Sequence, residues 1–255
     1  MPVRLGQKVQ ALPRRLAASQ RLSLGDTPAV IHVVAGVLID AAGHVLIAQR
    51  PTGKHLAGGW EFPGGKLEPG EERLAGLARE LREEIGITLD TPRPLIRVRH
   101  TYSYGEVLLD VWVVRRYAGE PRGLDGQALR WCTQEELAAA KLLPADRPIV
   151  AALRLPERLT QVSPADYEIH ASGWRPLPAV TAGGDTRLHG VLCTDAEQMT
   201  AAAEAGANFL ALCEPLAADE LTALCRSIFV PVYVRGLALE EAWALGASGI
   251  NDLDL

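Results

Sequence analysis

The hydrophobic pattern changes once along the chain, and this change constrains the fold more than any other feature. Residues 31–152 consist of apolar, β-rich runs followed by isolated helical segments, which favours α+β packing. Residues 188–255 instead alternate strand-like and helix-like segments, which predicts a parallel sheet with crossover helices. Proline, glycine and serine accumulate between these regions. A chain of 255 residues can form two modest cores, so we expect domains at 29–155 and 188–255, joined by a linker at 156–187.

Three segments of the first half carry clear local signals. The apolar runs at 31–39 and 45–50 flank the turn-like letters DAAGH and predict a hairpin. Residues 95–117 predict a second hairpin. Further on, Thr133 precedes a helical run and Glu136 follows three residues later, which is the spacing of a capping box.

Residues 72–85 predict an amphipathic helix that carries an unusual amount of negative charge. Its apolar stripe consists of Leu74, Ala78, Leu81 and Ile85, with Leu77 at the edge. Three acids share another face, Glu80, Glu83 and Glu84. Like charges at this spacing destabilise a helix by about 0.2 to 0.5 kcal/mol per pair, so a neutralising partner is expected. That partner is either a hard divalent ion such as Mg²⁺ or Mn²⁺, or the neighbouring Arg79 and Arg82 on a solvated face.

The letters around this helix follow a longer pattern. Gly65, Glu71 and the run from Arg79 to Ile87 stand at the spacing G-x5-E-x7-R-E-U-x-E-E-x-G-U, in which U is apolar. This pattern resembles the Nudix box, and every fixed position matches. The resemblance implies a Nudix α/β/α sandwich with a mixed sheet, and Mg²⁺-dependent hydrolysis of a nucleoside diphosphate linked to another group.

The resemblance also implies roles for individual residues. The expected metal ligands are the Gly64 carbonyl and the side chains of Glu80, Glu83, Glu84 and Asp125. Glu80 is the preferred general base, with Glu71 as the second candidate. Arg79 is expected on a different face from the three acids, where it pairs with Glu71 and orients the site, or forms a plain surface pair.

The segment at 45–71 narrows the expected substrate. It resembles MutT-type 8-oxo-dGTP diphosphatases, and the similarity extends over residues 30–155. This implies that Arg50 and Phe62 contact the nucleotide, and that the substrate 8-oxo-dGTP is converted to 8-oxo-dGMP and pyrophosphate, which would sanitise the nucleotide pool. A general diphosphatase acting on nucleoside di- or triphosphates linked to another group is the alternative.

Asp146 departs from the MutT-type pattern, which usually has Asn at this position as the purine-reading residue. An amide both donates and accepts hydrogen bonds, whereas an ionised carboxylate only accepts. Contact with N7–H of 8-oxoguanine therefore survives, while contact with O6 is in doubt. The alternative role for Asp146 is an ordinary helix N-cap before Pro148.

Residues 188–255 resemble the second half of a thiamine-phosphate-synthase-like (β/α)8 barrel. A complete barrel needs about 200 residues or more, so we expect a partial, degenerate barrel-like domain. Arg235 stands where that family has a phosphate-binding glycine, and we expect it to be a solvated arginine. Residual thiamine-phosphate synthase activity is one role. The other is a binding module that supports a homodimer, because a partial barrel would expose a strand edge and an apolar face.

Charge and composition exclude other classes of function. The net charge of −5 shows no basic excess for nucleic acid, so a nucleoside triphosphate is the expected partner. No apolar run suits a membrane span, and residues 1–28 predict a flexible basic arm. Four widely spaced cysteines indicate small core residues in a reducing compartment, the cytoplasm. The six histidines form no HxH or HxxxH pair, so each is expected to be structural or exposed.

Overall fold

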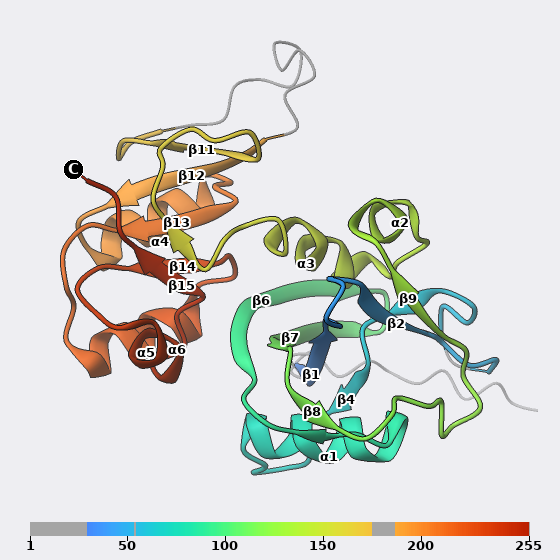
Figure 1. Ribbon diagram of the computed structural model, residues 1–255. Helices are drawn as coiled ribbons and strands as arrows, with labels where there is room; N and C mark the ends of the chain where they lie inside the picture. The colour runs from blue at the N-terminus through green and yellow to red at the C-terminus, as the bar shows by residue number, and fades with distance from the viewer. Residues whose placement is uncertain (1–29, 54, 175–186, 255) are drawn as a thin grey trace, which may run out of the picture.

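The computed structural model describes residues 30–53, 55–174 and 187–254. They form two lobes, an N-terminal one that ends with helix α3 and a C-terminal one built around a second sheet (Figure 1). The predicted arm at 1–28 lies outside the described residues. In the part of the chain that is described, no helix is both long and apolar enough to cross a membrane.

The N-terminal lobe contains nine strands, three α-helices and one 3-10 helix among the described residues. The strands are β1 (Ile31–Leu38), β2 (Val45–Gln49), β3 (Trp60–Glu61), β4 (Gly64–Lys66), β5 (Thr88–Leu89), β6 (Arg93–Tyr102), β7 (Gly105–Val114), β8 (Tyr117–Ala118) and β9 (Leu129–Cys132). The helices are α1 (Arg73–Ile85), α2 (Gln134–Ala139), η1 (Pro144–Asp146) and α3 (Arg147–Ala152). A four-stranded mixed sheet has the order β4-β1-β7-β6, and β1 pairs parallel to β7 and antiparallel to β4.

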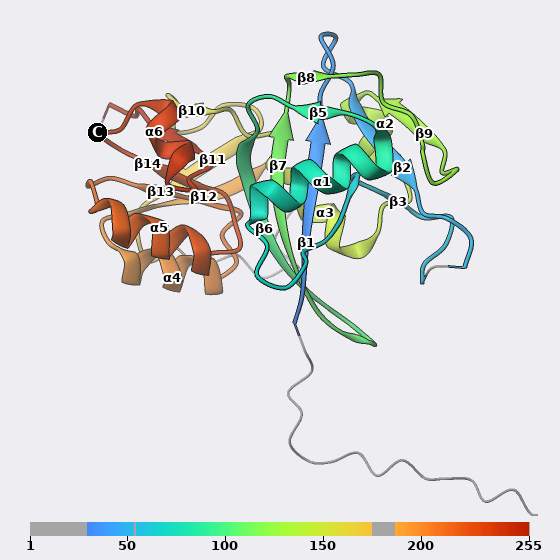
Figure 2. The same cartoon turned by 90° about the horizontal axis from the view of Figure 1, so that it is seen from below.

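Helices cover both faces of this mixed sheet, with α1 on one face and α3 on the other (Figure 2). The alternation of side chains along β1 explains the two layers. Val34 and Leu38 pack with α1, whereas Ala35 and Val37 pack in the core that includes Ile149 of α3. The expected α/β architecture with a mixed sheet is confirmed for this lobe.

Helix α1 forms where the sequence predicts it, but its buried stripe is rotated. Leu77, Leu81 and Ile85 are fully buried, while Leu74 is 42% exposed, so Leu77 and not Leu74 belongs to the core stripe. The helix approaches β1 closely at Gly36, where a Cβ would lie only 2.8 Å from the Leu81 Cδ1 atom. The absence of a side chain at Gly36 therefore lets Leu81 pack directly against β1.

The predicted hairpin between the first two apolar runs is wrong. Apart from one bridge between Ile39 and Val45, β1 and β2 do not pair: β2 joins β3 and β9 in a separate sheet. Both edges of β1 are already occupied by β4 and β7, so β2 has no edge to join. The second hairpin, β6 and β7, and the capping box of Thr133 and Glu136 at α2 are present as predicted.

The described residues of the C-terminal lobe form a six-stranded parallel sheet with three helices. Its elements are β10 (Arg158–Leu159), β11 (Tyr167–His170), β12 (Leu188–Cys193), α4 (Ala196–Glu204), β13 (Phe209–Leu212), α5 (Ala218–Ser227), β14 (Val232–Val234), α6 (Leu239–Ala244) and β15 (Gly249–Asn251). The strand order is β10-β15-β14-β13-β12-β11, so the first strand pairs with the last, as in a partly closed barrel. The segment expected as a linker, 156–187, contributes β10 and β11 to this sheet, and its residues 175–186 lie outside the description.

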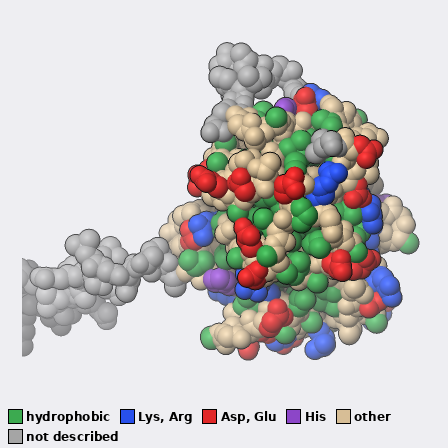
Figure 3. Space-filling model, turned by 90° about the vertical axis from the view of Figure 1, so that its left-hand side faces the viewer, with side chains coloured by type: hydrophobic (Ala, Val, Ile, Leu, Met, Phe, Trp, Pro, Cys, Tyr) green, Lys and Arg blue, Asp and Glu red, His purple; other side chains and the backbone are tan. Residues whose placement is uncertain are grey.

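Among the described residues, the inner face of the partial barrel is not the exposed apolar face that was expected. The concave face is filled by its own aromatic side chains, with Phe209 at 0% and Tyr233 at 2% exposure, and Tyr167 packs edge-on against Phe209. Gly190 leaves room for the Phe209 ring, which any Cβ at that position would overlap. On the outer face of this lobe, acidic and basic side chains are interspersed with apolar ones (Figure 3).

Candidate functional site

One cleft in the N-terminal lobe collects every residue that the sequence predicts for metal or substrate binding. The cleft has a volume of about 770 Å³. The predicted residues that line it are Arg50, Phe62, Gly64, Glu80, Glu83, Glu84, Asp125 and Asp146. Glu71 and Arg79 are not among the lining residues: Arg79 contacts the lining residues Glu80 and Glu83, and Glu71 contacts Arg79. Strand β4, helix α1 and the 3-10 helix η1 therefore bring distant parts of the sequence to one place.

The two glycines of β4 form the floor beside the acidic helix. Gly64 has φ +153°, and a Cβ there would overlap the Val34 carbonyl oxygen. Its backbone N–H donates to Glu84 Oε2 at 2.8 Å. At Gly65, a Cβ would overlap the carboxylate of Glu80. Because neither residue has a side chain, β4 can lie directly against Val34 of β1 and against the carboxylate of Glu80.

Arg79 is the centre of the charge network. Its Nε and Nη2 donate to the two oxygens of Glu71, each at 2.8 Å, which is a bidentate pair. Its Nη1 donates to Glu80 at 2.9 Å and to Glu83 at 3.2 Å. The predicted pair of Arg79 with Glu71 is present. The prediction that Arg79 lies on a different face from the three acids is wrong, because Glu83 is four residues further on and shares its side of the helix, and Arg79 also contacts Glu80.

This network shifts the pKa of the groups it joins. Hydrogen bonds from Arg79, supported by the Glu68 backbone N–H, lower the pKa of Glu71 to about 2. The same contacts raise the pKa of Arg79. Glu80 and Glu83 share one guanidinium with Glu71, and Glu84 accepts from a neutral backbone amide, so the protein offsets only part of their mutual repulsion.

The donor set of the cleft fits a hard divalent ion. Three glutamates of one helix face the cleft with the Gly64 backbone, and Asp125 adds an exposed carboxylate. Oxygen ligands of this kind suit Mg²⁺ or Mn²⁺. The loop that carries Asp125 is tied to the end of α1, because the Asp125 N–H donates to Gln127 Oε1 at 2.9 Å and Gln127 Nε2 donates to the Glu84 carbonyl at 3.0 Å.

The other end of the cleft contains Asp146. Phe62 is buried there, and Arg50 forms an ion pair with Glu61. Asp146 is 5% exposed and occupies the N-cap position of α3, but its side chain makes no capping hydrogen bond. The N-cap alternative is therefore wrong. Burial raises the pKa of Asp146 well above its ordinary value, Glu61 raises it further and Arg50 lowers it.

Several aromatic residues at this end were not predicted from the sequence. Tyr102 and Tyr104 stack with ring centroids 5.1 Å apart, and His55 packs edge-on against Tyr104. All three line the cleft, as does Glu61. The sequence pattern that could have predicted them is TYSYG, in which the two tyrosines alternate with other residues, because this spacing places both rings on one side of a hairpin tip. Their flat faces suit a nucleobase.

A mixed sheet between two helical layers, with a glycine strand and three glutamates at one cleft, defines a hydrolase of the Nudix class. The chain belongs to the Nudix family: the family model described as "NUDIX domain" matches residues 34–152. The match contains the whole of the cleft except Ile31 and Val33 at its edge.

Named relatives match the same half of the chain. The CTP pyrophosphohydrolase of Escherichia coli is 39% identical over 137 residues, which cover 54% of this chain and 98% of the relative. The 8-oxo-dGTP diphosphatase of Escherichia coli is 32% identical over 124 residues, covering 49% and 96%. A solution structure of the Escherichia coli ORF135 protein is 38% identical, covers 49% of this chain and 89% of that one, and has a TM-score of 0.45.

Proposed function

We propose that the N-terminal lobe hydrolyses oxidised purine nucleoside triphosphates, converting 8-oxo-dGTP to 8-oxo-dGMP and pyrophosphate with Mg²⁺ or Mn²⁺. The observation that carries this proposal is one cleft that is lined both by the carboxylates of α1 and by aromatic side chains, Arg50 and Asp146. The relative named 8-oxo-dGTP diphosphatase supports the substrate class. We place the base near Asp146 and the aromatic side chains, and the phosphates near the carboxylates of α1.

The residues of the cleft would have different roles in the reaction. Glu80, Glu83, Glu84, Asp125 and the Gly64 carbonyl would hold the metal. The ion would supply charge neutralisation for the phosphates and a lowered pKa for the attacking water. Arg79 forms ion pairs with Glu80 and Glu83 in this structure. If an ion bound these two carboxylates instead, Arg79 could keep its ion pair with Glu71.

Of the two candidates, Glu80 suits the role of general base better than Glu71. A general base must reach the attacking water and must accept its proton. Glu80 lines the cleft above Gly65. Glu71 is outside the lining residues, both of its oxygens are held by Arg79, and its pKa of about 2 makes it a weak base. We therefore assign Glu71 and Arg79 as positioning residues.

Asp146 can read a base if it is neutral. A protonated carboxyl group donates through O–H and accepts through its carbonyl oxygen, as an amide does. It can then donate to O6 and accept from N7–H of 8-oxoguanine, which restores the contact that an ionised Asp lacks. The raised pKa of Asp146 favours this neutral form. A neutral carboxyl also complements N3 and N4–H of cytosine, so a cytidine triphosphate is the second candidate, supported by the relative named CTP pyrophosphohydrolase.

A substrate panel tests the proposal. With Mg²⁺, kcat/KM is measured for 8-oxo-dGTP, dGTP, CTP and dCTP, and pyrophosphate is scored against orthophosphate. Preference for 8-oxo-dGTP over dGTP supports the proposal, and preference for CTP supports the second candidate. Equal values for all four would reduce the assignment to a general nucleotide diphosphatase.

A substitution that removes one carboxylate charge and keeps the shape of the side chain tests the metal assignment in the same assay. The side chain of Glu83 is 63% exposed and contacts Arg79, so Glu83→Gln should keep the fold while removing nearly all turnover. Glu135→Gln on exposed α2 is the matched control and should behave as the original chain. Full turnover by Glu83→Gln would contradict the metal assignment.

For the C-terminal lobe we propose a binding or structural role, with thiamine-phosphate synthesis as the less favoured activity. Its concave face is filled by Phe209 and Tyr233, which leaves no substrate space among them. Arg235 donates to the Leu253 carbonyl at 2.9 Å and thus holds the chain end. An assay for thiamine phosphate formation by the full chain tests this, because product formation would overturn it.

A further inference from the structure

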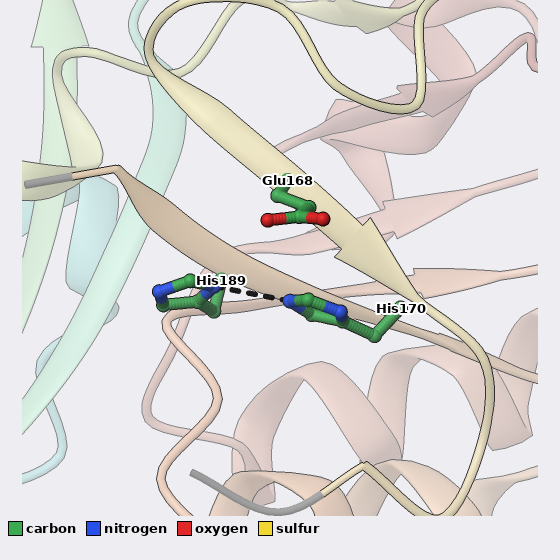
Figure 4. A group of neighbouring side chains, drawn as sticks. All are labelled: Glu168, His170 and His189. Carbon is green, nitrogen blue, oxygen red and sulfur yellow. Dashed lines mark hydrogen bonds between the residues drawn. The ribbon is translucent and has the colours of Figure 1, made fainter. Parts of the chain in front are cut away.

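Two histidines and a glutamate meet on the C-terminal sheet, outside the nucleotide cleft (Figure 4). Glu168 and His170 are two residues apart on β11 and therefore point to the same face. His189 on β12 is the register partner of Glu168 and points to that face too. One ligand atom from each of the three lies within 4.8 Å of the other two, and all three residues are half-buried.

The distance between one nitrogen of each ring is close to the distance between two histidine nitrogens that bind the same metal ion. His170 Nε2 lies 3.0 Å from His189 Nδ1. Two imidazole nitrogens bound to one tetrahedral Zn²⁺, each at about 2.0 to 2.1 Å from the ion, are separated by about 3.3 to 3.4 Å. To bind one ion, the two nitrogens must separate by a few tenths of an ångström, and the rings must turn so that both lone pairs point at the ion instead of at each other.

We propose that Glu168, His170 and His189 form a binding site for a divalent transition ion, Zn²⁺ in the first place. Imidazole with one carboxylate suits Zn²⁺, Ni²⁺ or Cu²⁺, whereas the all-oxygen set of the nucleotide cleft suits Mg²⁺ or Mn²⁺. Three protein ligands leave one tetrahedral position for water. The two lobes thus hold chemically distinct sites that prefer different ions.

The surroundings orient the proposed ligands. Arg187 Nη2 lies 2.9 Å from Glu168 Oε2, and the other carboxylate oxygen can bind an ion while this pair persists. Trp174 stacks on both rings, with centroids 5.1 Å from His170 and 5.5 Å from His189. The positive charge of Arg187 repels a cation at this position and so weakens the binding of ions that depend on electrostatic attraction alone. This contact therefore disfavours Mg²⁺ here and leaves ions that bind imidazole strongly.

Zn²⁺ titration of the full chain, prepared without a histidine tag, tests the proposal. Isothermal titration calorimetry is performed in excess Mg²⁺, which occupies carboxylate-only sites. We expect one strong Zn²⁺ site per chain, lost in His170→Ala and in His189→Ala. His32→Ala, which removes an exposed strand histidine of the other lobe, should retain it. Unchanged Zn²⁺ binding by the two site variants, or no Zn²⁺ binding by the original chain, would overturn the proposal.

Co²⁺ provides an independent spectroscopic test. Co²⁺ with few, nitrogen-containing ligands absorbs visible light strongly, whereas hydrated or six-coordinate Co²⁺ absorbs weakly. Strong absorption should appear with the original chain and with His32→Ala, and should be absent with His170→Ala. Mg²⁺-dependent nucleotide turnover should be equal in all three proteins, which also confirms that each is folded. Weak absorption with the original chain would contradict a histidine-bound ion.

Discussion

Asp146 should make the stability of the protein fall as pH rises. Its pKa in the folded state is raised by burial and by Glu61. Below about pH 3.9, the carboxyl is protonated in both the folded and the unfolded state. Above it, the unfolded chain releases the proton while the folded chain keeps it, so stability declines until pH exceeds the folded pKa. Each unit of difference in pKa corresponds to about 1.4 kcal/mol.

The substitution Asp146→Asn isolates this effect because Asn has the same shape and does not titrate. We expect Asp146→Asn to gain free energy of unfolding over the original chain as pH rises from about 4 toward the folded pKa of Asp146. Urea unfolding at several pH values measures the difference. A difference that does not change with pH would show that Asp146 is ionised in the folded protein.

Arg79 should control the acid limit of activity through Glu71. In Arg79→Gln, the pKa of Glu71 should return from about 2 toward its ordinary value of 4.5, because its bidentate partner is lost. Glu80 and Glu83 lose their shared counterion in the same variant. We expect kcat to fall at neutral pH, and a further loss as pH drops through about 4.5.

The comparison is a pH profile of kcat/KM for Arg79→Gln and Arg79→Lys against the original chain. Lysine restores the charge but not the bidentate geometry, so it should recover only part of the activity. Equal profiles for all three proteins would show that the pair of Arg79 and Glu71 does not orient the site.

Strand β4 and helix α1 are the elements that build the carboxylate site, and Gly65 is their point of contact. An alanine there would overlap the Glu80 carboxylate, which can move aside because it is the end of a flexible side chain. We expect Gly65→Ala to lower kcat by about a hundredfold through displacement of Glu80. The free energy of unfolding should change by less than about 1 kcal/mol. Urea unfolding and steady-state kinetics on the same sample decide between lost geometry and lost fold.

The elements differ in how far their sequence determines them. Local signals sufficed for α1 and for the capping box at Thr133, because spacing within one segment fixes them. The partners of β1 were predicted wrongly, since the strands that occupy its edges, β4 and β7, lie far away along the chain. The contact between His170 and His189 could not be predicted for the same reason. It depends on β11 and β12 becoming neighbours in the sheet, and no short sequence spacing determines which strands pair.

At the scale of the whole molecule, the two lobes share polar contacts, and those of Ser248 are buried. Ser248 Oγ donates to the Leu95 carbonyl at 2.8 Å, and the same oxygen accepts from the Val232 N–H at 3.1 Å. Arg93 of β6 forms an ion pair with Glu157 at 2.9 Å. Ser248 is 6% exposed, so its hydroxyl joins strands of both lobes within the protein interior. The lobes should therefore unfold together.

Replacing this hydroxyl tests the coupling. Ser248→Ala leaves the Leu95 carbonyl and the Val232 N–H without their partner, which should cost about 1 to 3 kcal/mol of unfolding free energy. Ser227→Ala is the matched control, because the Ser227 hydroxyl donates only within its own helix, to the Leu224 carbonyl at 2.9 Å. Urea unfolding is followed by tryptophan fluorescence and by loss of nucleotide hydrolysis, which reports on the N-terminal lobe alone. Both signals should move to lower urea together in Ser248→Ala. If hydrolysis kept its original midpoint while fluorescence shifted, the lobes would be independent, and the shared hydroxyl would stabilise the C-terminal lobe only.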